Sequence, residues 1–589
     1  MPHALTSPGT PTDAIGALQD SPGPTIVQRP DEYDAIVVGA GASGGWAAKR
    51  LTEAGLTVAI VDAGRPHTDR DFREHLRPFD LRYRNHAPEV VRRTRPRQSE
   101  CYACTEYNYD WFADDLEEPY TTPPDKPFSW QGRMRLAGGR TNVWARQCYR
   151  LSDLDFKAAS FDGFGVDWPL GYADLAPYYD LVEEYVGISG MAEGLEHLPD
   201  GRFLPPMPLT CPEQHLRERL RSAFGRTLTI GRCANLTRPH RGRAACHYCG
   251  PCERGCITRS YFNAAFTTLA DAMATGRCTH IPNAMVCRVD MDPVRNRACG
   301  VTYVDRISRA VHDVRARVVI LCAQALESVR ILLNSATRQH PAGLGNSSGA
   351  LGHYLMDHVW NGGGASCEWP DFPGKASLGG PRRPTGFYIA RFRNTRLEPR
   401  HGAFLRGYAL QGGWGDGPGF SWGAPGYGAA YKEALLNSVT TMNMGGMGEC
   451  LPRWENYVEL DRDVVDAYGI PVLRIHMSWS DNERAMIADM ATAAAEMLEA
   501  AGAKNIQPWT VPDRMPGMGI HETGVARMGA DPRTSVLNQF QQTHDIPNLF
   551  VMDGSGFPSG GCQNPTLTIM ALAVRSSDYL MGQMRQGSL

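Results

Sequence analysis

Four cysteines in one short stretch have the spacing of metal ligands. Cys246, Cys249, Cys252 and Cys256 follow the pattern C-x2-C-x2-C-x3-C in the sequence CHYCGPCERGC. Short loops of this kind gather several thiolates around one centre, and the spacing is that of bacterial iron–sulfur proteins. Zinc sites more often use two separated pairs, so a zinc site and four plain thiols remain as alternatives. We expect one iron–sulfur cluster here, and the spacing leaves open whether it holds three or four irons.

Three glycines near the amino terminus are spaced to hold a nucleotide. Gly39, Gly41 and Gly44 follow an apolar run and begin a helix-forming stretch, and a second apolar run ends in Asp62. This order of strand, glycine turn, helix, strand and acid is the dinucleotide-binding fingerprint. In it, Gly39 makes the tight turn, Gly41 lets the backbone approach a pyrophosphate, and Gly44 lets the helix pack on the strand. Asp62 would accept hydrogen bonds from ribose hydroxyls, and the motif alone does not distinguish FAD from NAD.

An α/β fold must position these groups. Apolar runs and helix-forming stretches alternate around the glycine motif and again in the second quarter and middle of the chain. The expected strands are 35–38, 57–61, two within 279–304 and 318–323, and the expected helices are 42–54, 167–190, 261–275 and 324–333. Residues 65–125 lack a clear period and are expected to be an irregular excursion.

Length and composition limit the protein class. A chain of 589 residues exceeds one compact core, so two or more domains are expected. Hydrophobic residues at 42% and charged residues at 21% are typical of a globular protein, and the net charge of −3 argues against nucleic-acid binding. Residues 1–30 are rich in Pro, Gly, Ser and Thr, and we expect a flexible tail without an export signal. No apolar run is long enough to cross a bilayer.

The closing part of the chain carries a second dense set of motifs, and these reveal a family resemblance. Together with the glycine fingerprint, the closing motifs closely resemble the GMC oxidoreductases, a family of FAD enzymes that oxidise alcohols and sugars. The resemblance extends over residues 31–580. The motifs that carry it are GIHETG at 519–524, RMG at 527–529, NLFVMDGS at 548–555, QNPTLT at 563–568, Gly138-Gly139, Glu327-Ser328, LGNS at 344–347 and Asp357-His358.

The resemblance implies a fold and a domain order. The fold class is α/β: a Rossmann-like FAD-binding domain interleaved with an α+β substrate domain built on an antiparallel sheet. After the tail at 1–30, the implied FAD-binding parts are 31–165 (with the excursion at 65–125), 263–350 and 516–589 with an active-site loop. The implied substrate-domain parts are 166–240, which includes a connector, and 351–515, and the cysteine insertion is 241–262.

The resemblance also implies which residues do the chemistry. Moving hydride from a carbinol carbon to a flavin requires that the hydroxyl proton also leaves, so a base must lie beside the ring. Histidine suits this role because its pKa is near neutrality. His521 occupies the family's catalytic H-x-x-G position, and Asn564 matches the partner position. Asparagine cannot take a proton at neutral pH, so His521 is the implied base and Asn564 the implied positioning group.

Further residues are implied to contact the cofactor. Some sugar oxidases of the family tether FAD through a histidine where this chain has Val143, so non-covalent FAD is expected. Thr566 could equally cap the final helix. The implied FAD contacts are Gly39, Gly41, Ser43, Gly44, Asp62, Gly139, Thr141, Asn142, Val286, Asp553 and Thr566.

The inserted cysteines narrow the resemblance to the catalytic subunits of bacterial sugar dehydrogenases. The stretches CHYCGPCERGC, CAQALES and DWPLGYADLAPYYD most resemble glucoside 3-dehydrogenases, which oxidise carbon 3 of a pyranoside to a ketone. Electrons would then leave through the cluster, with 3Fe-4S favoured over 4Fe-4S, to cytochrome c or a quinone, and a small accessory subunit is expected. The alternatives are a structural cluster, a pyranose or C-glycoside oxidase using oxygen, a gluconate, fructose or glucose dehydrogenase, and a non-catalytic flavin subunit. The compartment stays open between the cytoplasm and a periplasm reached by co-export with a partner.

Overall fold

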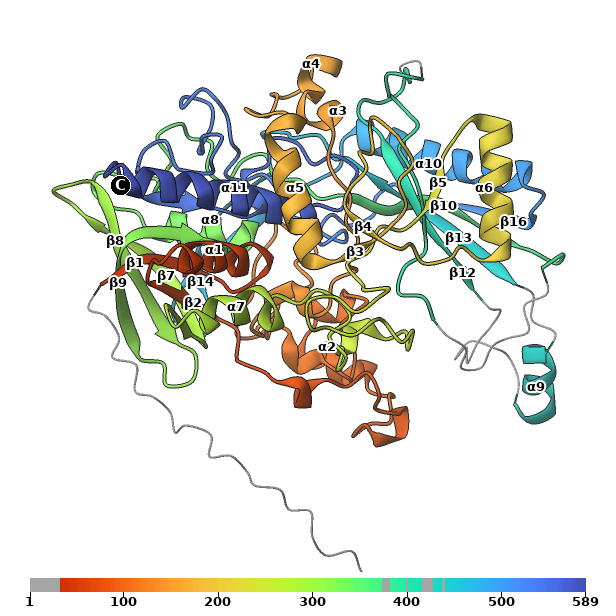
Figure 1. Cartoon of the computed structure of the whole chain (residues 1–589), viewed down its shortest axis with the longest axis horizontal. Helices are drawn as coiled ribbons and strands as arrows, with labels where there is room; N and C mark the ends of the chain where they lie inside the picture. Colours follow the sequence, from red (N-terminus) through yellow and green to blue (C-terminus); the bar gives the residue numbers. More distant parts are fainter. Residues whose placement is uncertain (1–31, 373–381, 399–400, 416–426, 437–439) are drawn as a thin grey trace, which may run out of the picture. The chain divides into compact units, whose positions relative to one another are not determined.

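The computed structural model describes residues 32–372, 382–398, 401–415, 427–436 and 440–589, so the predicted tail at 1–30 lies outside the described residues. A parallel sheet forms the half of the fold that contains the glycine fingerprint (Figure 1). Its strands lie in the order β6 (Cys278–Ile281), β2 (Val58–Val61), β1 (Tyr33–Val38) and β9 (Val311–Leu321), and β17 (Leu549–Val551) pairs with the end of β9. All four residues of β2 are buried, as the central strands of a parallel sheet are when both faces are covered.

Strand β9 belongs to two sheet arrangements along its length. Its first residues pair antiparallel with β8 (Arg297–Asp305), which pairs in turn with β7 (Ala284–Asp292). Its last residues pair in parallel with β1 and β17. The strand predicted at 318–323 is therefore confirmed but is longer than expected, because its exposed first half alternates in burial and lacks the continuous apolar run of its second half.

Helices cover this sheet. The helix α1 (Ala42–Glu53) packs against α7 (Thr268–Ala274) and α11 (Thr566–Arg585), and α11 packs against α5 (Tyr172–Val186). Helix α8 (Ala325–Asn334) packs against β7. The predicted helices are confirmed: three have shorter bounds, and α8 is shifted by one residue. For example, α5 ends at Gly187 in a left-handed conformation, which terminates a helix at little cost.

An antiparallel sheet forms the second half. Its strands lie in the order β16 (Lys504–Thr510), β10 (Val359–Glu368), β13 (Thr441–Gly448), β12 (Tyr408–Gly415), β11 (Phe387–Ile389) and β5 (Leu228–Ile230). Helix α10 (Asp481–Ala500) packs on β10, β13 and β16. Helix α10 approaches β10 closely because β10 is glycine-rich. A Cβ at Gly363 would lie 2.2 Å from the carbonyl oxygen of Ile487 on α10.

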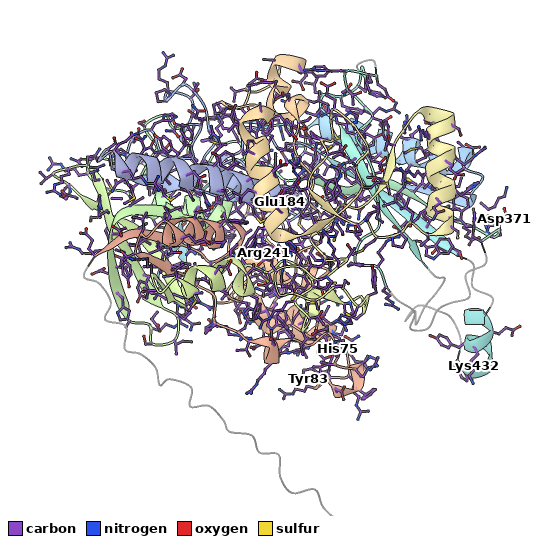
Figure 2. The ribbon with its side chains drawn as sticks, in the orientation of Figure 1. His75, Tyr83, Glu184, Arg241, Asp371 and Lys432 are labelled. Carbon is purple, nitrogen blue, oxygen red and sulfur yellow. The ribbon has the colours of Figure 1, made fainter. Side chains whose placement is uncertain are left out.

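The remaining elements are short, apart from α6 and the hairpin formed by β14 and β15. This hairpin contacts α8. The irregular excursion at 65–125 is confirmed, because it contains only α2 and short 3-10 turns. It includes the labelled His75 and Tyr83 at one edge of the drawn structure (Figure 2). In the part of the chain that the structure describes, no helix is long and apolar enough to span a membrane. The bounds are α2 (Pro88–Thr94), α3 (Asp153–Phe156), α4 (Ala158–Asp162), α6 (Cys211–Phe224), α9 (Gly428–Leu436), β3 (Ile188–Ser189), β4 (Phe203–Leu204), β14 (Tyr457–Val465) and β15 (Pro471–His476).

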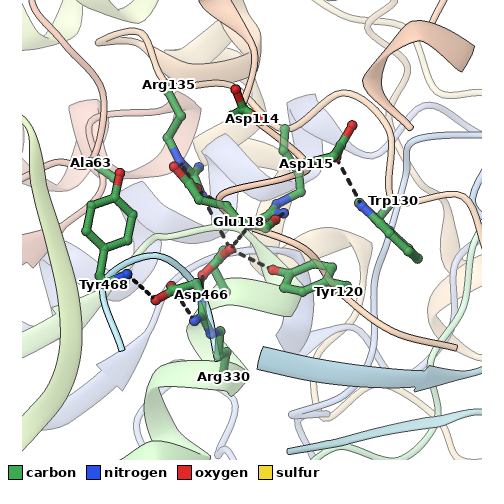
Figure 3. Close-up of polar contacts among 12 residues, drawn as sticks. Ala63, Asp114, Asp115, Glu118, Tyr120, Trp130, Arg135, Arg330, Asp466 and Tyr468 are labelled. Atoms are coloured by element: carbon green, nitrogen blue, oxygen red, sulfur yellow. Dashed lines mark hydrogen bonds and ion pairs between the residues drawn. The ribbon is translucent and has the colours of Figure 1, made fainter. Parts of the chain in front are cut away.

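A buried network of charges joins the end of the excursion, α8 and the hairpin (Figure 3). Arg135 Nε donates to Glu118 at 2.7 Å, and Arg330 Nη2 donates to Asp466 at 2.6 Å. Glu327 bridges the two pairs, since it lies 3.5 Å from Arg135 and 3.4 Å from Arg330. Breaking a buried ion pair by removing one partner typically costs about 3–5 kcal/mol. The network therefore holds three segments that are distant in sequence in one fixed arrangement.

Candidate active site

A single cavity gathers residues from both ends of the chain. Its walls are the turn after β1, the end of β2, loop 133–144, strand β7, the start of α8, loop 520–522 and the start of α11. Most of the residues expected to contact a cofactor line it. These are Gly39, Gly41, Ser43, Asp62, Gly139, Thr141, Val286, Asp553 and Thr566, together with the expected base His521.

The three glycines of the first turn have different surroundings. Gly39 has a φ of +97°, and a Cβ there would lie 2.6 Å from the carbonyl oxygen of Cys322. Gly44 does not line the cavity, and a Cβ on it would lie 1.9 Å from the carbonyl oxygen of Gly39, so its role is close packing of helix on strand. A Cβ on Gly41 would meet no atom within 4 Å. Gly41 therefore faces open cavity, where a ligand can approach its backbone.

Asp62 presents an unsatisfied acceptor beside this turn. Its carboxylate lines the cavity, and Oδ2 is buried without a hydrogen-bond partner. Nε2 of His280 lies 3.8 Å from this oxygen and also lacks a hydrogen-bond partner. Buried polar atoms are nearly always paired, so this carboxylate has the chemistry to accept hydrogen bonds from the ribose hydroxyls of a bound nucleotide. The unpaired carboxylate of Asp62 thus fits the adenosine part of a dinucleotide.

A second glycine turn lies next to the first in the cavity wall. Gly138 and Gly139 have positive φ angles of 86° and 54°, and a Cβ on Gly139 would lie 3.6 Å from the Cα of Gly41. Asn142 does not line the cavity. Its Nδ2 instead donates to the carbonyls of Ala137 and Gly139 at 2.9 and 2.8 Å. Asn142 therefore acts on the cavity through the loop conformation that it stabilises.

The remaining expected contacts lie near the start of α11. Asp553 is buried, and its Oδ2 accepts from the hydroxyl of Ser328 at 2.5 Å. Burial raises the pKa of Asp553, although its hydrogen bonds with Ser328 and Ser555 oppose that effect. Thr566 is the first residue of α11 and the helix has no side-chain cap, so Thr566 does not cap it. Its place in the cavity wall supports the expected ligand contact.

His521 and the turn that carries it are held at three points. Its backbone N–H donates to Asp357 Oδ1 at 2.9 Å, and the N–H of Gly519 donates to Asp357 Oδ2 at 2.8 Å. Its ring Nδ1 lies 3.1 Å from Nδ1 of His358. The backbone between these anchors includes Ile520 at a φ of 59°, an unusual conformation for a β-branched residue. The turn therefore presents the His521 ring to the cavity in one defined position.

The His521 ring is neutral. Burial lowers its pKa well below the ordinary value, and the neighbouring His358 and Arg140 lower it further. A neutral imidazole keeps one nitrogen lone pair, so it can accept a proton at neutral pH. Because Nδ1 already interacts with His358, Nε2 is the nitrogen left for the cavity.

Asn564 is oriented by the antiparallel sheet. It is buried next to the cavity residue Pro565, and its Oδ1 accepts from Nε2 of Gln411 on β12 at 2.9 Å. The amide group has one carbonyl and one NH2, so this bond leaves Nδ2 of Asn564 as the free donor. The oxygen and nitrogen positions follow from this hydrogen-bond assignment.

Sequence reasoning missed the partners of these groups. Asp357-His358 appeared only as a family match, although an acid beside a histidine is itself a signal of a titratable site. Arg140 forms a bidentate ion pair with Glu522, with Nη1–Oε2 and Nη2–Oε1 distances of 2.6 and 3.0 Å. Both residues line the cavity. Gln411 lies far from every motif, and nothing in its local sequence indicates its role.

The four expected metal ligands lie on one loop beside the second glycine turn. The loop ends near Tyr261, whose hydroxyl donates to the carbonyl of Asn142 at 2.6 Å. Burial, followed by the thiols of Cys252 and Cys256, raises the pKa of Cys249 to about 11. Nevertheless, no group of three or more His, Cys, Asp or Glu side chains among the described residues is arranged to hold a metal ion. The thiol chemistry suits a cluster, but the sulfur positions are not those of a ligand set.

The fold and the cavity define a dinucleotide-binding oxidoreductase with a half-buried histidine, His521, in the wall of the cavity. Comparison with protein families identifies it further. Two family models described as GMC oxidoreductase match residues 33–360 and 452–573. The chain therefore belongs to the GMC oxidoreductases, and like them it is an FAD-binding enzyme. The family and fold predicted from the sequence are confirmed.

Several characterised proteins resemble the chain over nearly its whole length. It is 30% identical to 2-methyl-1,2-propanediol dehydrogenase of Mycolicibacterium austroafricanum, over 93% of this chain and 95% of that protein. It is 27% identical to the fructose dehydrogenase large subunit of Gluconobacter japonicus, over 94% and 98%. A formate oxidase structure from Aspergillus oryzae shares the fold, with a TM-score of 0.61 and 16% identity over 94% of this chain and 99% of that chain.

Proposed function

We propose that this protein oxidises a secondary hydroxyl of a sugar, at carbon 3 of a pyranoside, and so forms a 3-keto glycoside. The observation that carries the proposal is the neutral His521, whose Nδ1 is occupied and whose Nε2 is left for the cavity. Relatives named as acting on sugars support the substrate class. They include the fructose dehydrogenase large subunit and, at 28% identity over 50% of this chain, a C-glycoside 3-oxidase of Arthrobacter globiformis.

In the proposed reaction, His521 and Asn564 act on the substrate hydroxyl. Nε2 of His521 accepts the hydroxyl proton, while Nδ2 of Asn564 donates to the same oxygen and stabilises its developing negative charge. FAD, when bound non-covalently, supplies the acceptor for the hydride from the carbinol carbon. Gly41, Asp62 and the second glycine turn would hold the cofactor.

For the electrons we propose an exit through an iron–sulfur cluster on Cys246, Cys249, Cys252 and Cys256. The donor set supports this proposal, since four thiols in the C-x2-C-x2-C-x3-C spacing suit iron–sulfur ligation. The position of the loop also supports it, because the Tyr261–Asn142 hydrogen bond connects the loop to the turn that lines the FAD cavity. A 3Fe-4S cluster is favoured over 4Fe-4S. Relatives named as a large subunit and as a flavoprotein of gluconate 2-dehydrogenase favour an accessory subunit and an external acceptor such as cytochrome c or a quinone.

An oxidase that passes electrons to oxygen is the second candidate. It is favoured by the relative named paromamine 6'-oxidase of Streptomyces fradiae, which is 28% identical over 94% of this chain and 92% of that protein. Oxygen consumption that matches substrate turnover would support the oxidase. Slow oxygen uptake together with fast reduction of an artificial acceptor would support the dehydrogenase.

The test is anaerobic mixing of the purified flavoprotein with a panel of glycosides, polyols and aldonic acids. We expect glycosides to bleach the flavin absorbance fastest and the product to carry a ketone at carbon 3. The His521→Ala variant should retain FAD but reduce it more slowly by a factor on the order of 10² to 10⁴. Fastest bleaching by a non-sugar alcohol would contradict the substrate class, and an unchanged rate in His521→Ala would contradict the proposed base.

A further inference from the structure

His358 does not line the cavity, yet it contacts the ring of the proposed base. The two rings are nearly perpendicular, with an interplanar angle of 84° and centroids 4.9 Å apart. The Nδ1 atoms of the two rings lie 3.1 Å apart. The other nitrogen of His358, Nε2, lies 3.0 Å from the carbonyl oxygen of Gly561. Thus both ring nitrogens of His358 are engaged by named partners.

The positions of the ring protons follow from these partners. A carbonyl oxygen can only accept, so Nε2 of His358 must carry a proton and donate to Gly561. Burial holds His358 in the neutral form, with its pKa lowered to about 4, so its Nδ1 carries a lone pair. The short contact between the two Nδ1 atoms can then be a hydrogen bond only if Nδ1 of His521 donates. In the neutral His521 ring, that leaves the lone pair on Nε2.

We infer that His358 is a positioning residue that fixes the tautomer of His521, so that the lone pair lies on the nitrogen left for the cavity. This inference rests on the proposed role of His521 as the base. A neutral histidine with a free Nδ1 divides between two tautomers, and the one protonated at Nε2 cannot take the substrate proton. When His521 becomes a cation, its Nδ1–H still donates to His358, and this bond gains strength because its donor is charged.

The backbone near His358 supports the same function. Asp357, the preceding residue, accepts the N–H groups of Gly519 and His521. Two consecutive side chains therefore hold the 519–521 turn, one through its backbone and the other through the ring. The acceptor of the His358 proton, Gly561, lies three residues before Asn564 and has a positive φ of 62°. His358 thus links the segment of the base to the segment of the positioning group.

Two substitutions separate the tautomer function from simple packing. In His358→Asn, the side-chain oxygen can occupy the place of Nδ1 and accept from His521, while the bond to Gly561 is lost. In His358→Gln, the amide NH2 can occupy the place of Nε2 and keep the bond to Gly561, while the acceptor for His521 is lost. If the inference is correct, His358→Gln reduces the anaerobic rate of flavin reduction on the order of 10²-fold, with little change in substrate affinity, and His358→Asn stays within a few-fold of wild type.

A second readout does not depend on turnover. Diethyl pyrocarbonate acylates the unprotonated nitrogen of imidazole, so its reaction at His521, followed by mass spectrometry of the peptide, reports the free lone pair. We expect slower modification in His358→Gln and wild-type modification in His358→Asn, with FAD content unchanged in both. Equal rates for both variants in flavin reduction would overturn the inference. Loss of activity in His521→Ala together with full activity in His358→Gln would overturn the inference about His358 but leave His521 as the proposed base. Full activity in His521→Ala would instead overturn the proposal that His521 is the base.

Discussion

Nε2 of Gln411, on the antiparallel sheet, donates a hydrogen bond to Oδ1 of Asn564 at 2.9 Å. Asn564 directly precedes the cavity residue Pro565. Gln411 and Asn564 are 153 positions apart in the sequence. The bond joins the sheet proposed to bind substrate to the segment proposed to position the reacting hydroxyl. The direction of the Asn564 amide therefore depends on how the two halves of the protein meet.

Reversing this hydrogen bond should turn the donor of Asn564 away from the substrate. In Gln411→Glu the new carboxylate can only accept, so the Asn564 amide is expected to rotate and present its oxygen to the substrate. We expect flavin reduction to slow on the order of 10²-fold, which is the usual cost of removing one donor to a developing oxyanion. Stopped-flow absorbance gives the rate. Gln411→Leu, which removes the bond without reversing it, is the control and should lose less, and a greater loss in the control would contradict this explanation.

The pH dependence of flavin reduction should reveal the lowered pKa of His521. Because burial, His358 and Arg140 lower that pKa well below 6.5, the base is unprotonated at neutral pH. The rate of flavin reduction should therefore be constant around pH 7 and fall only as the pH drops well below 6.5. Asp357, which contacts the His521 backbone, has its pKa raised to about 7 by burial and by Glu522, so Asp357→Asn is the control for a contribution from that carboxyl. A rate that halves near pH 7 in both proteins would contradict a base whose pKa is lowered well below 6.5.

Substitutions at two glycines of the first turn should have different effects, one on FAD binding and the other on stability. Because a Cβ at Gly41 would meet only open cavity, Gly41→Val should fold normally but bind FAD more weakly by on the order of tenfold, which is about 1.4 kcal/mol. A Cβ at Gly44 would collide with the carbonyl of Gly39, so Gly44→Ala should lower the stability by about 1–3 kcal/mol. Isothermal titration with FAD and thermal melting of the apoprotein measure the two effects. Equal destabilisation by both changes would be inconsistent with a cavity at Gly41.

Removing one proposed cluster ligand should stop electron exit but not substrate oxidation. In Cys252→Ser we expect loss of iron and acid-labile sulfide, retained FAD and normal anaerobic flavin reduction. Reduction of an external acceptor should then become much slower. Cys101→Ser is the control because this buried thiol lies outside the loop, and it should keep the full iron content. Wild-type protein without iron, after aerobic and anaerobic purification alike, would contradict the cluster.

The sequence by itself determined the family and the nucleotide-binding unit. The β1–α1–β2 unit could be predicted because its signals are local: two short apolar runs, a glycine turn between them and an acid at the end. The family followed because its motifs occur in order at both ends of the chain. The cysteine spacing likewise predicted one loop of neighbouring thiols, although local spacing does not fix how their sulfurs converge.

The tertiary structure decided the roles of individual side chains. In the structure Asn142 lies outside the cavity and bonds to the backbone of its own loop. The structure also shows that His521 contacts His358 and that Asn564 contacts Gln411. These pairs join residues separated by more than a hundred positions, so they depend on how the two sheets and their loops pack and not on any local pattern. The free nitrogen of the proposed base is fixed in the same way, because a tautomer is set by the hydrogen bond at the opposite side of the ring.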